Sequence, residues 1–352
     1  MRRILTLILL PLTLVSGATW WAYHRDLRDL HAHLSGSATI ARTAFGPVSY
    51  ASGGDGMPLL AIHGAGGGHD QGRLLAEAFA PEGYRWIAPS RFGYPGSPMP
   101  DKASTEAQAD AFAALIDSLG VEQVTVIAMS GGVPPALHFA RRHPQRTRAL
   151  ILISLAPFAP LGAEEQELPV PLWLYNTLFA SDFPLWAVLR LAPRRLAPMF
   201  DARDDLKDQT TESEAAFVQA MMFAFLPATL RRAGLANEGA AIDPAATIDP
   251  AMILVPTLVI HARDDRITPF STAGFAAEQI PGAQLFELET GGHLLLGHHD
   301  TVRQRIAEFL EPLERAQTLQ PPPLKKDLTD DHVQDHPDRQ SYETPTSPAN
   351  QQ

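Results

Sequence analysis

Apolar segments that alternate with helical patterns are the feature that most constrains how this 352-residue chain can fold. Short apolar runs, of the kind found in buried strands, alternate with longer runs whose apolar residues recur at helical spacing. The expected strands cover residues 59–62, 84–88, 123–128, 149–154, 257–262 and 284–288, and the expected helices cover 105–119, 133–142 and 302–313. Strands that alternate with helices imply a mostly parallel sheet with helices on both faces. The sequence therefore predicts the α/β class.

Two departures from this alternation add detail to the predicted architecture. Residues 37–43 and 48–52 have the pattern of two strands joined by a short turn, which predicts antiparallel strands at one edge of the sheet. Residues from about 157 to 250 contain apolar helical patterns and many prolines but no convincing strand. We expect them to form a helical cap over one end of the sheet, within a domain that spans residues 37–316.

The first 24 residues carry signals for export. An arginine pair at residues 2–3 precedes an apolar run over residues 4–23, close to the ~20 residues that a helix needs to cross a bilayer. Trp20 and Trp21 at its far end favour a retained membrane anchor, whereas Ser16-Gly17-Ala18 favours a cleaved signal peptide. Because the tryptophans follow the small residues so closely, we favour the anchor. We expect a catalytic domain held at the inner membrane outside the cytoplasm, or a secreted or periplasmic protein if the segment is cleaved.

Composition excludes several classes of function. The net charge of -11 argues against a nucleic-acid partner, because phosphate binding requires clustered lysine and arginine. The absence of cysteine excludes disulfides, a cysteine nucleophile and thiolate metal sites. Residues 317–352 are rich in proline, charged residues and glutamine. Such a segment cannot bury a core, so we expect a disordered tail.

A serine between an expected strand and an expected helix is the strongest sign of chemistry. Ser130 lies shortly after the strand at 123–128 and shortly before the helix at 133–142. A sharp turn at this place strains the backbone and holds the hydroxyl clear of the sheet. Ala128 and Gly132 supply the small residues needed where strand and helix come close together. The small-x-Ser-x-Gly pattern occurs by chance in many chains, but in this setting it indicates a nucleophile.

A glycine-rich segment, His63-Gly64-Ala65-Gly66-Gly67-Gly68, directly follows another expected strand. Such a turn can aim backbone N–H groups at a developing oxyanion. The partner N–H group should come from Gly131, the residue after the nucleophile. The segment lacks the Lys-Ser/Thr ending of a phosphate-binding loop and the glycine spacing of a dinucleotide site. We expect His63 itself to be a structural residue of the loop.

An acid and a base follow the last two expected strands. A carboxylate at the carboxyl end of one strand can reach an imidazole on the next such loop. In the Arg-Asp-Asp-Arg run we choose Asp265, since we expect Asp264 to face solvent or to cap the turn. His293 follows the last strand and is the expected base. His298 and His299 are alternatives, but they fall at the expected start of the last helix.

Together these pieces resemble the α/β-hydrolase superfamily over about residues 46–313. The chain order Ser, Asp, His is the order of that superfamily. In its esterases and carbon–carbon-bond hydrolases the acid corresponds to the second aspartate of the Arg-Asp-Asp run, which implies Asp265. One position departs from the pattern, because Ser90 stands where relatives commonly carry aspartate. The departure concerns contacts on the substrate side and leaves the triad intact.

The resemblance implies an α/β-hydrolase fold with a helical cap and a serine hydrolase acting on a small-molecule ester or related acyl substrate. Ser130 would attack the carbonyl carbon, His293 would take its proton and Asp265 would fix the imidazole tautomer. The N–H groups of Ala65 and Gly131 would form the oxyanion hole. We expect no metal and no organic cofactor.

Other functions fit the same residues or the same fold. Carbon–carbon-bond hydrolysis and cofactor-free perhydrolysis use the same triad. A catalytically silent binding protein on the hydrolase fold is a different class of function, and the complete triad argues against it. A serine at position 130 argues against haloalkane dehalogenase and epoxide hydrolase chemistry, because those relatives carry an aspartate there.

Overall fold

A computed structural model describes residues 2–158, 172–241 and 248–318 of the chain. Its strands form one eight-stranded sheet in the order β1-β2-β4-β3-β5-β6-β7-β8. The strands are β1 (Thr39–Thr43), β2 (Gly46–Gly53), β3 (Met57–Ile62), β4 (Tyr84–Pro89), β5 (Val124–Ser130), β6 (Thr147–Leu155), β7 (Thr257–Ala262) and β8 (Gln284–Leu288). The pairs β1–β2 and β2–β4 are antiparallel, and the other pairs are parallel. The predicted mostly parallel sheet with an antiparallel edge is confirmed.

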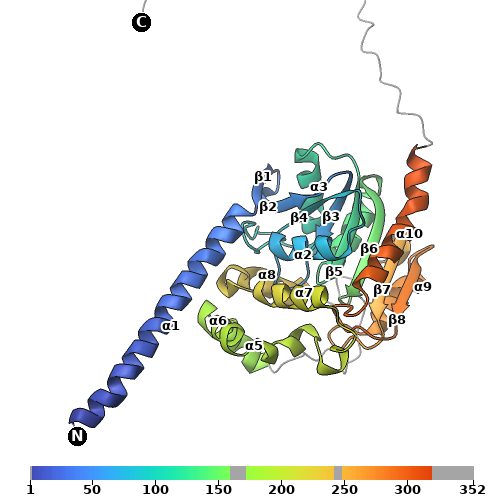
Figure 1. Cartoon of the computed structure of the whole chain (residues 1–352). Helices are drawn as coiled ribbons and strands as arrows, with labels where there is room; N and C mark the ends of the chain where they lie inside the picture. The colour runs from blue at the N-terminus through green and yellow to red at the C-terminus, as the bar shows by residue number, and fades with distance from the viewer. Residues whose placement is uncertain (1, 159–171, 242–247, 319–352) are drawn as a thin grey trace, which may run out of the picture. The chain divides into compact units, whose positions relative to one another are not determined.

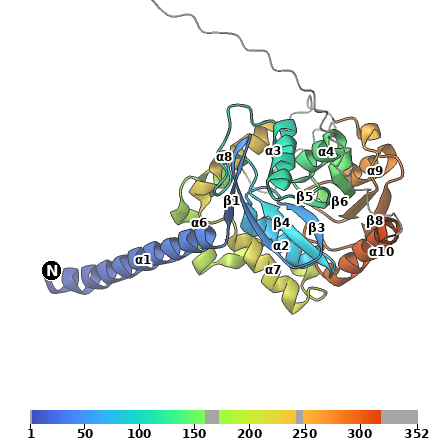
Figure 2. The ribbon, with the colours of Figure 1, turned by 90° about the horizontal axis from the view of Figure 1, so that it is seen from above.

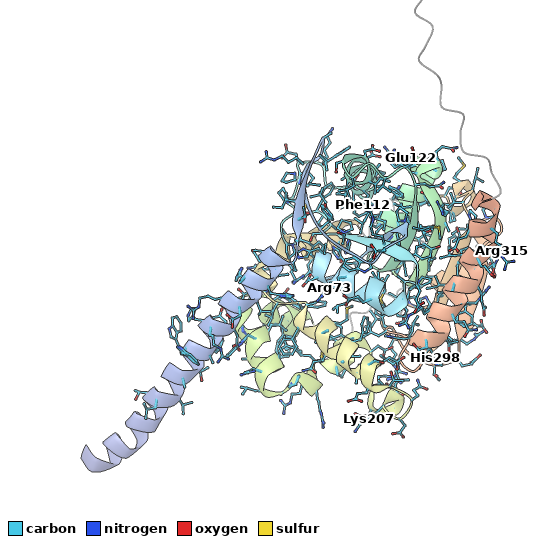
Figure 3. All side chains as sticks on the ribbon, turned by 45° about the horizontal axis from the view of Figure 1, so that its top comes forward. Arg73, Phe112, Glu122, Lys207, His298 and Arg315 are labelled. Carbon is cyan, nitrogen blue, oxygen red and sulfur yellow. The ribbon has the colours of Figure 1, made fainter. Side chains whose placement is uncertain are left out.

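Helices cover both faces of this sheet, as Figure 2 shows: α3, α4 and α9 lie on one side, and α2 and α10 on the other. Their bounds are α2 (His69–Phe79), α3 (Thr105–Ser118), α4 (Val133–Arg142), α9 (Phe270–Gln279) and α10 (His299–Thr318). Side chains fill the space on either side of the sheet (Figure 3), where Phe112 of α3 is fully buried.

Strand β3 explains why the central strands appear in the sequence as continuous apolar runs. Leu59 and Ala61 belong to the core on the α2 and α10 side, whereas Leu60 and Ile62 belong to the core on the α3 and α4 side. Successive side chains of a strand point to opposite faces, so a strand covered on both faces needs apolar residues at every position.

The sequence prediction missed α2, α8 (Arg232–Ala241) and α9, and each of these helices contains glycine. Glycine lowers helix propensity and so weakens the local signal. At two of the positions the fold requires it. A Cβ on Gly72 would lie 3.0 Å from Ala88 Cβ, and a Cβ on Gly234 would lie 2.3 Å from the ring of Tyr94. The glycines that permit this close tertiary contact therefore make the helices hard to predict from helix propensity.

The segment between β6 and β7, which we call the insertion, carries helices and no strand among its described residues. Its longer helices are α5 (Leu172–Leu178), α6 (Asp182–Leu191), α7 (Glu212–Phe223) and α8. Figure 1 shows them gathered along one side of the sheet and its helices. Helix α7 begins with a capping box, in which Thr211 and Glu214 satisfy each other's backbone N–H groups.

The amino-terminal part forms one helix, α1 (Arg2–Gly36), which runs through both the expected anchor and the residues after it. Its second half contacts the insertion: the Tyr23 ring lies 5.3 Å from the rings of Phe183 and Trp186, and Trp186 Nε1 donates to Asp26 Oδ2 at 3.1 Å. Among the described residues, no helix combines the length and the apolarity needed to cross a membrane.

Helix α10 ends at Thr318, two residues beyond the predicted end of the domain at 316. The rest of the expected disordered tail, residues 319–352, lies outside the described residues.

Candidate active site

Ser130 is the last residue of β5, at the turn that leads into α4. Its φ of 52° lies in the left-handed region, which residues other than glycine rarely adopt. A Cβ on Gly132 would lie 2.5 Å from the carbonyl oxygen of Ile62, so only glycine fits two residues after the serine. The close neighbour is therefore the end of β3, rather than the helix that the sequence argument invoked. This strained strand–turn–helix geometry is that of a nucleophile elbow.

Asp265 and His293 meet at the carboxyl ends of β7 and β8. His293 Nδ1 lies 2.9 Å from Asp265 Oδ2, and both side chains are buried. Thr268 Oγ1 donates to the same oxygen at 2.7 Å. The other carboxylate oxygen accepts the backbone N–H groups of Ile267 and Thr268 at 2.8 and 2.9 Å. Because Nδ1 faces the carboxylate, the proton is held on Nδ1 and Nε2 is left to act as a base.

The charges of this pair stabilise each other. Burial alone would raise the pKa of the Asp265 carboxyl, but the neighbouring His293 charge and the hydrogen bonds from His261 and His293 hold it far below its usual value. Burial alone would lower the pKa of His293, but the Asp265 charge and hydrogen bond raise it above 6.5. An imidazole that gains a proton is therefore stabilised here.

Strand β6 lies between the serine and the histidine. Ser130 is in register with Leu155 at the end of this strand, and Ser154 Oγ donates to the backbone oxygen of His293 at 2.7 Å. Within the described residues, no hydrogen bond joins Ser130 Oγ to His293. In enzymes of this type such bonds often close only in the complex with substrate. The structure thus pairs the acid with the base and places the serine at the carboxyl end of β5, with β6 between it and the strands that carry the pair.

Two buried donors orient the peptide bond between Gly64 and Ala65. His63 Nδ1 and Arg91 Nη2 each lie 2.8 Å from the Gly64 carbonyl oxygen. A trans peptide points its N–H opposite to its C=O, so the Ala65 N–H is directed away from both donors. The Ala65 nitrogen lies 3.3 Å from the position that a Cβ on Gly131 would occupy. The two predicted oxyanion-hole residues therefore lie side by side.

His63 has the structural role that the sequence suggested. It is fully buried, and its Nε2 accepts the backbone N–H of Arg91 at 3.0 Å. Burial, together with the nearby Arg91 charge, holds the pKa of His63 well below 6.5. The ring is therefore neutral, with its proton on Nδ1 facing the Gly64 carbonyl.

Sequence reasoning missed His261, which approaches the same carboxylate oxygen as His293. Its Nε2 lies 3.1 Å from Asp265 Oδ2 and from the Thr268 carbonyl oxygen, and its Nδ1 accepts the backbone N–H of Leu155 at 3.2 Å. Since Nδ1 is an acceptor, Nε2 carries the proton, which faces these two oxygens. The available signal was a histidine inside an otherwise apolar strand, four residues before the acid.

Sequence reasoning gave only part of the role of Asp264 and missed Asp201. Asp264 is partly exposed, and its Oδ1 accepts the Gly292 N–H at 2.9 Å while its Oδ2 lies 2.5 Å from Arg203. Asp201, from the insertion, accepts the backbone N–H of His293 at 3.1 Å. Both carboxylates hold the loop that carries the base. No local motif marks Asp201, because only the fold brings the insertion to this loop.

The other residues in question serve the scaffold. His299 Nε2 bonds the Leu294 carbonyl at 2.9 Å, at the start of α10. His298, labelled in Figure 3, lies one residue before that helix. Ser90, which stands in place of the usual aspartate, accepts the backbone N–H of His69 at 2.9 Å and so supports the start of α2.

The insertion packs directly on the glycine-rich loop. Arg231 is fully buried and donates to the Gly67 carbonyl at 2.5 Å while forming a bidentate pair with Asp70. The ring of Phe225 lies where a Cβ on Gly66 would be. These contacts fix the loop from the side of the insertion.

A cavity with about 490 Å³ of atom-free space, part of it open to solvent, lies beside Gly131. Polar side chains from the loop after β4 and from α8, including Arg91, Tyr94 and Glu238, line it together with apolar groups such as Pro134 and Ala156. Among the described residues, no group of three histidine or acidic side chains is arranged to hold a metal ion.

Comparison with known proteins identifies the family. Residues 57–300 match the alpha/beta hydrolase fold family, and the chain belongs to it. The chain is 30% identical over 264 residues to a 2-hydroxymuconate semialdehyde hydrolase of Pseudomonas putida, covering 73% of this chain and 87% of that protein. It is 28% identical over 241 residues to a pimeloyl-[acyl-carrier protein] methyl ester esterase of Aromatoleum aromaticum, covering 67% and 90%.

Among solved structures, an alpha/beta hydrolase fold protein from Nakamurella multipartita matches with a TM-score of 0.60 at 30% identity. The match covers 78% of this chain and 99% of that one. These relationships support a hydrolase as the class of enzyme and a small molecule as its substrate.

Proposed function

We propose that the protein is a serine hydrolase that cleaves a small acyl ester through an acyl-enzyme intermediate on Ser130. The observation that carries this proposal is the buried Asp265–His293 hydrogen bond, which leaves Nε2 of the imidazole as a base on the same edge of the sheet as a strained serine. A buried acid–base pair beside a serine elbow is the arrangement needed to activate a hydroxyl nucleophile.

The first half-reaction forms the acyl-enzyme. His293 Nε2 removes the Ser130 hydroxyl proton as the oxygen attacks the carbonyl carbon, and then returns that proton to the leaving alcohol. The imidazolium forms next to the Asp265 charge, which already raises the pKa of His293. The N–H groups of Ala65 and Gly131 receive the oxyanion, and each such donor contributes about 2.7–4 kcal/mol in comparable sites. Water then hydrolyses the acyl-enzyme by the same proton route.

The insertion acts as the cap of this site in our proposal. Support comes from Phe225 and Arg231, which pack on the glycine-rich loop, and from Glu238, which lines the cavity beside Gly131. A cap excludes bulk water and strengthens the electrostatic interactions that stabilise the oxyanion.

Carbon–carbon-bond hydrolysis is the second candidate function. The Pseudomonas putida relative is named for a semialdehyde substrate rather than an ester, and the same serine, histidine and aspartate would serve either reaction. An ester panel compared with a panel of ring-cleavage-type dienoate ketones separates the two candidates by their kcat/KM values.

Labelling with a fluorophosphonate probe tests the shared mechanism, because the probe forms a covalent adduct only on an activated serine. We expect one adduct, which peptide mapping places on Ser130. The Ser130→Ala variant should lose labelling and turnover of p-nitrophenyl butyrate, whereas Ser213→Ala, at an exposed serine of α7, should keep both. Full ester turnover by Ser130→Ala would rule out the proposal.

We also propose that the protein is exported, with residues 1–24 retained as an anchor or removed as a signal peptide. The charge and apolar pattern of this segment supports the proposal. The contacts with the insertion begin at Tyr23, so cleavage after Ala18 would leave them intact. Amino-terminal sequencing of the protein from separated cell fractions tests both forms. Recovery only from the cytoplasm with Met1 in place would refute export.

A further inference from the structure

Helix α8 delivers a carboxylate to the loop after β4. Glu238 Oε1 accepts hydrogen bonds from Arg91 Nη2 and from the Tyr94 hydroxyl, the latter at 2.5 Å. The Tyr94 oxygen in turn accepts the Gly66 N–H at 3.1 Å. Only 12% of the Glu238 side chain and 7% of the Arg91 side chain is exposed. One oxygen of this carboxylate is thus fully occupied and fixed.

The other oxygen has no donor. Among the described residues nothing donates to Glu238 Oε2, and this atom lies 3.2 Å from the position of a Cβ on Gly131. A carboxylate oxygen can only accept hydrogen bonds. Glu238 lines a cavity that is partly open to solvent. The structure therefore presents a carboxylate oxygen without a protein donor beside the residue that follows Ser130.

The position of this oxygen matters for the reaction. Glu238 and Gly131 line the same cavity, and the Ala65 nitrogen also lies 3.3 Å from the Cβ position of Gly131. An oxyanion formed at these N–H groups would develop close to a negative carboxylate, and like charges at short range repel. A donor carried by the substrate would satisfy Oε2 and remove this repulsion.

We propose that Glu238 is a specificity residue for acyl substrates that carry a hydrogen-bond donor, a hydroxyl or an amino group, close to the scissile carbonyl. This role rests on the proposed serine hydrolase function, because the scissile carbonyl is the one that Ser130 would attack. Arg91 and Tyr94 orient the carboxylate, and Arg91 balances its charge. A substrate with a carboxylate at the same place is repelled.

Glu238 is not needed to hold α8 in place. The backbone N–H of Gly234 donates to the Gly93 carbonyl at 3.1 Å. A Cβ on Gly93 would lie 2.6 Å from the Gly234 nitrogen, so the helix and the loop are in direct backbone contact. In Glu238→Gln the side-chain carbonyl can still accept from Arg91 and Tyr94, while an NH₂ donor replaces the free acceptor. This variant changes the recognition group and keeps the packing.

Binding of small amides to the full-length protein tests the proposal without requiring turnover. The probes are 2-hydroxypropanamide, 2-aminopropanamide and 2-methylpropanamide, which place a hydroxyl, an ammonium or a methyl group at one position. Ligand-observed NMR titrations give their Kd values. A hydrogen bond to a charged group predicts roughly tenfold tighter binding of the first two than of the methyl compound. In Glu238→Gln the preference should fall to within about twofold, and in the exposed control Glu308→Gln it should remain.

Equal binding of the hydroxyl and methyl amides to the wild-type protein would overturn the proposal, as would an unchanged preference in Glu238→Gln. Fluorophosphonate labelling in the same samples separates this result from the fate of the proposed function. A donor preference without labelling of Ser130 supports the subsite and refutes the hydrolase. Labelling without any preference refutes the subsite alone.

Discussion

The carboxyl ends of strands β5, β7 and β8, which we call the rim, and the insertion contribute to the site in different ways. The rim supplies Ser130, Asp265 and His293, each at or shortly after the end of a strand and each in a short motif. The insertion supplies Asp201, Arg231 and Glu238, which reach the site from helices or turns without any motif. Chemistry at a strand end is fixed by local backbone geometry, whereas contacts from the insertion depend on how distant segments pack. The first kind of residue is readable from sequence, and the second kind is not.

We expect the largest effect on activity from a substitution at the rim. Asp265→Asn leaves the shape of the acid but removes its charge and frees the imidazole to take the other tautomer. We expect kcat for an ester to fall by about 10⁴, the loss found for the same change in a comparable triad. Steady-state kinetics with Asp208→Asn, at an exposed aspartate, as the control would measure it. A loss smaller than tenfold would show that Asp265 is not the orienting acid.

A change in the insertion should act first on stability. Arg231→Met leaves Asp70 buried without its partner, although the pair holds the pKa of that carboxyl below its usual value against the effect of burial. We expect a loss of about 3–5 kcal/mol in the free energy of unfolding. Arg232→Met changes the neighbouring exposed arginine and should cost no more than about 0.5 kcal/mol. Equal losses from the two variants in urea denaturation would contradict the role given to Arg231.

His261 belongs to the rim but acts through Asp265. His261→Phe removes a hydrogen bond to a charged group, so we expect a loss of about 1.5–3 kcal/mol in stability. Its effect on kcat should be smaller than that of Asp265→Asn, and the pH at which activity is half-maximal should also move. An unchanged pH profile together with normal kcat would make His261 a packing residue only.

The smallest expected effect is a shift in the pH profile of activity. Activity needs neutral His293, and the Asp265 charge raises the pKa of this base above 6.5. kcat/KM should therefore fall as the pH drops through a value above 6.5. In Asp265→Asn the effect of burial dominates, so the inflection should move to lower pH. An inflection that stays in place would mean that another group controls the rate.

The outcome of sequence reasoning follows the same division. Each strand of the described sheet was predicted within a few residues; the central ones were clearest, because strands buried on both faces are continuously apolar. The sequence prediction missed helices α2 and α8, because Gly72 and Gly234 weaken the helical pattern at the positions where another segment packs closely. The second aspartate of the Arg-Asp-Asp run does lie against His293, whereas the first, expected to face solvent or to cap the turn, binds Gly292 and Arg203. Nothing in the local sequence shows that the Asp264 carboxylate binds Gly292 and Arg203 rather than water.

Trapping the covalent intermediate tests the central claim most directly. The full-length protein is mixed with p-nitrophenyl butyrate and quenched in acid within the first turnover, and its intact mass is measured. Our account predicts a mass increase of one butyryl group, located on the peptide that contains Ser130. Ester hydrolysis without any acylated protein, or with the acyl group on another residue, would contradict it.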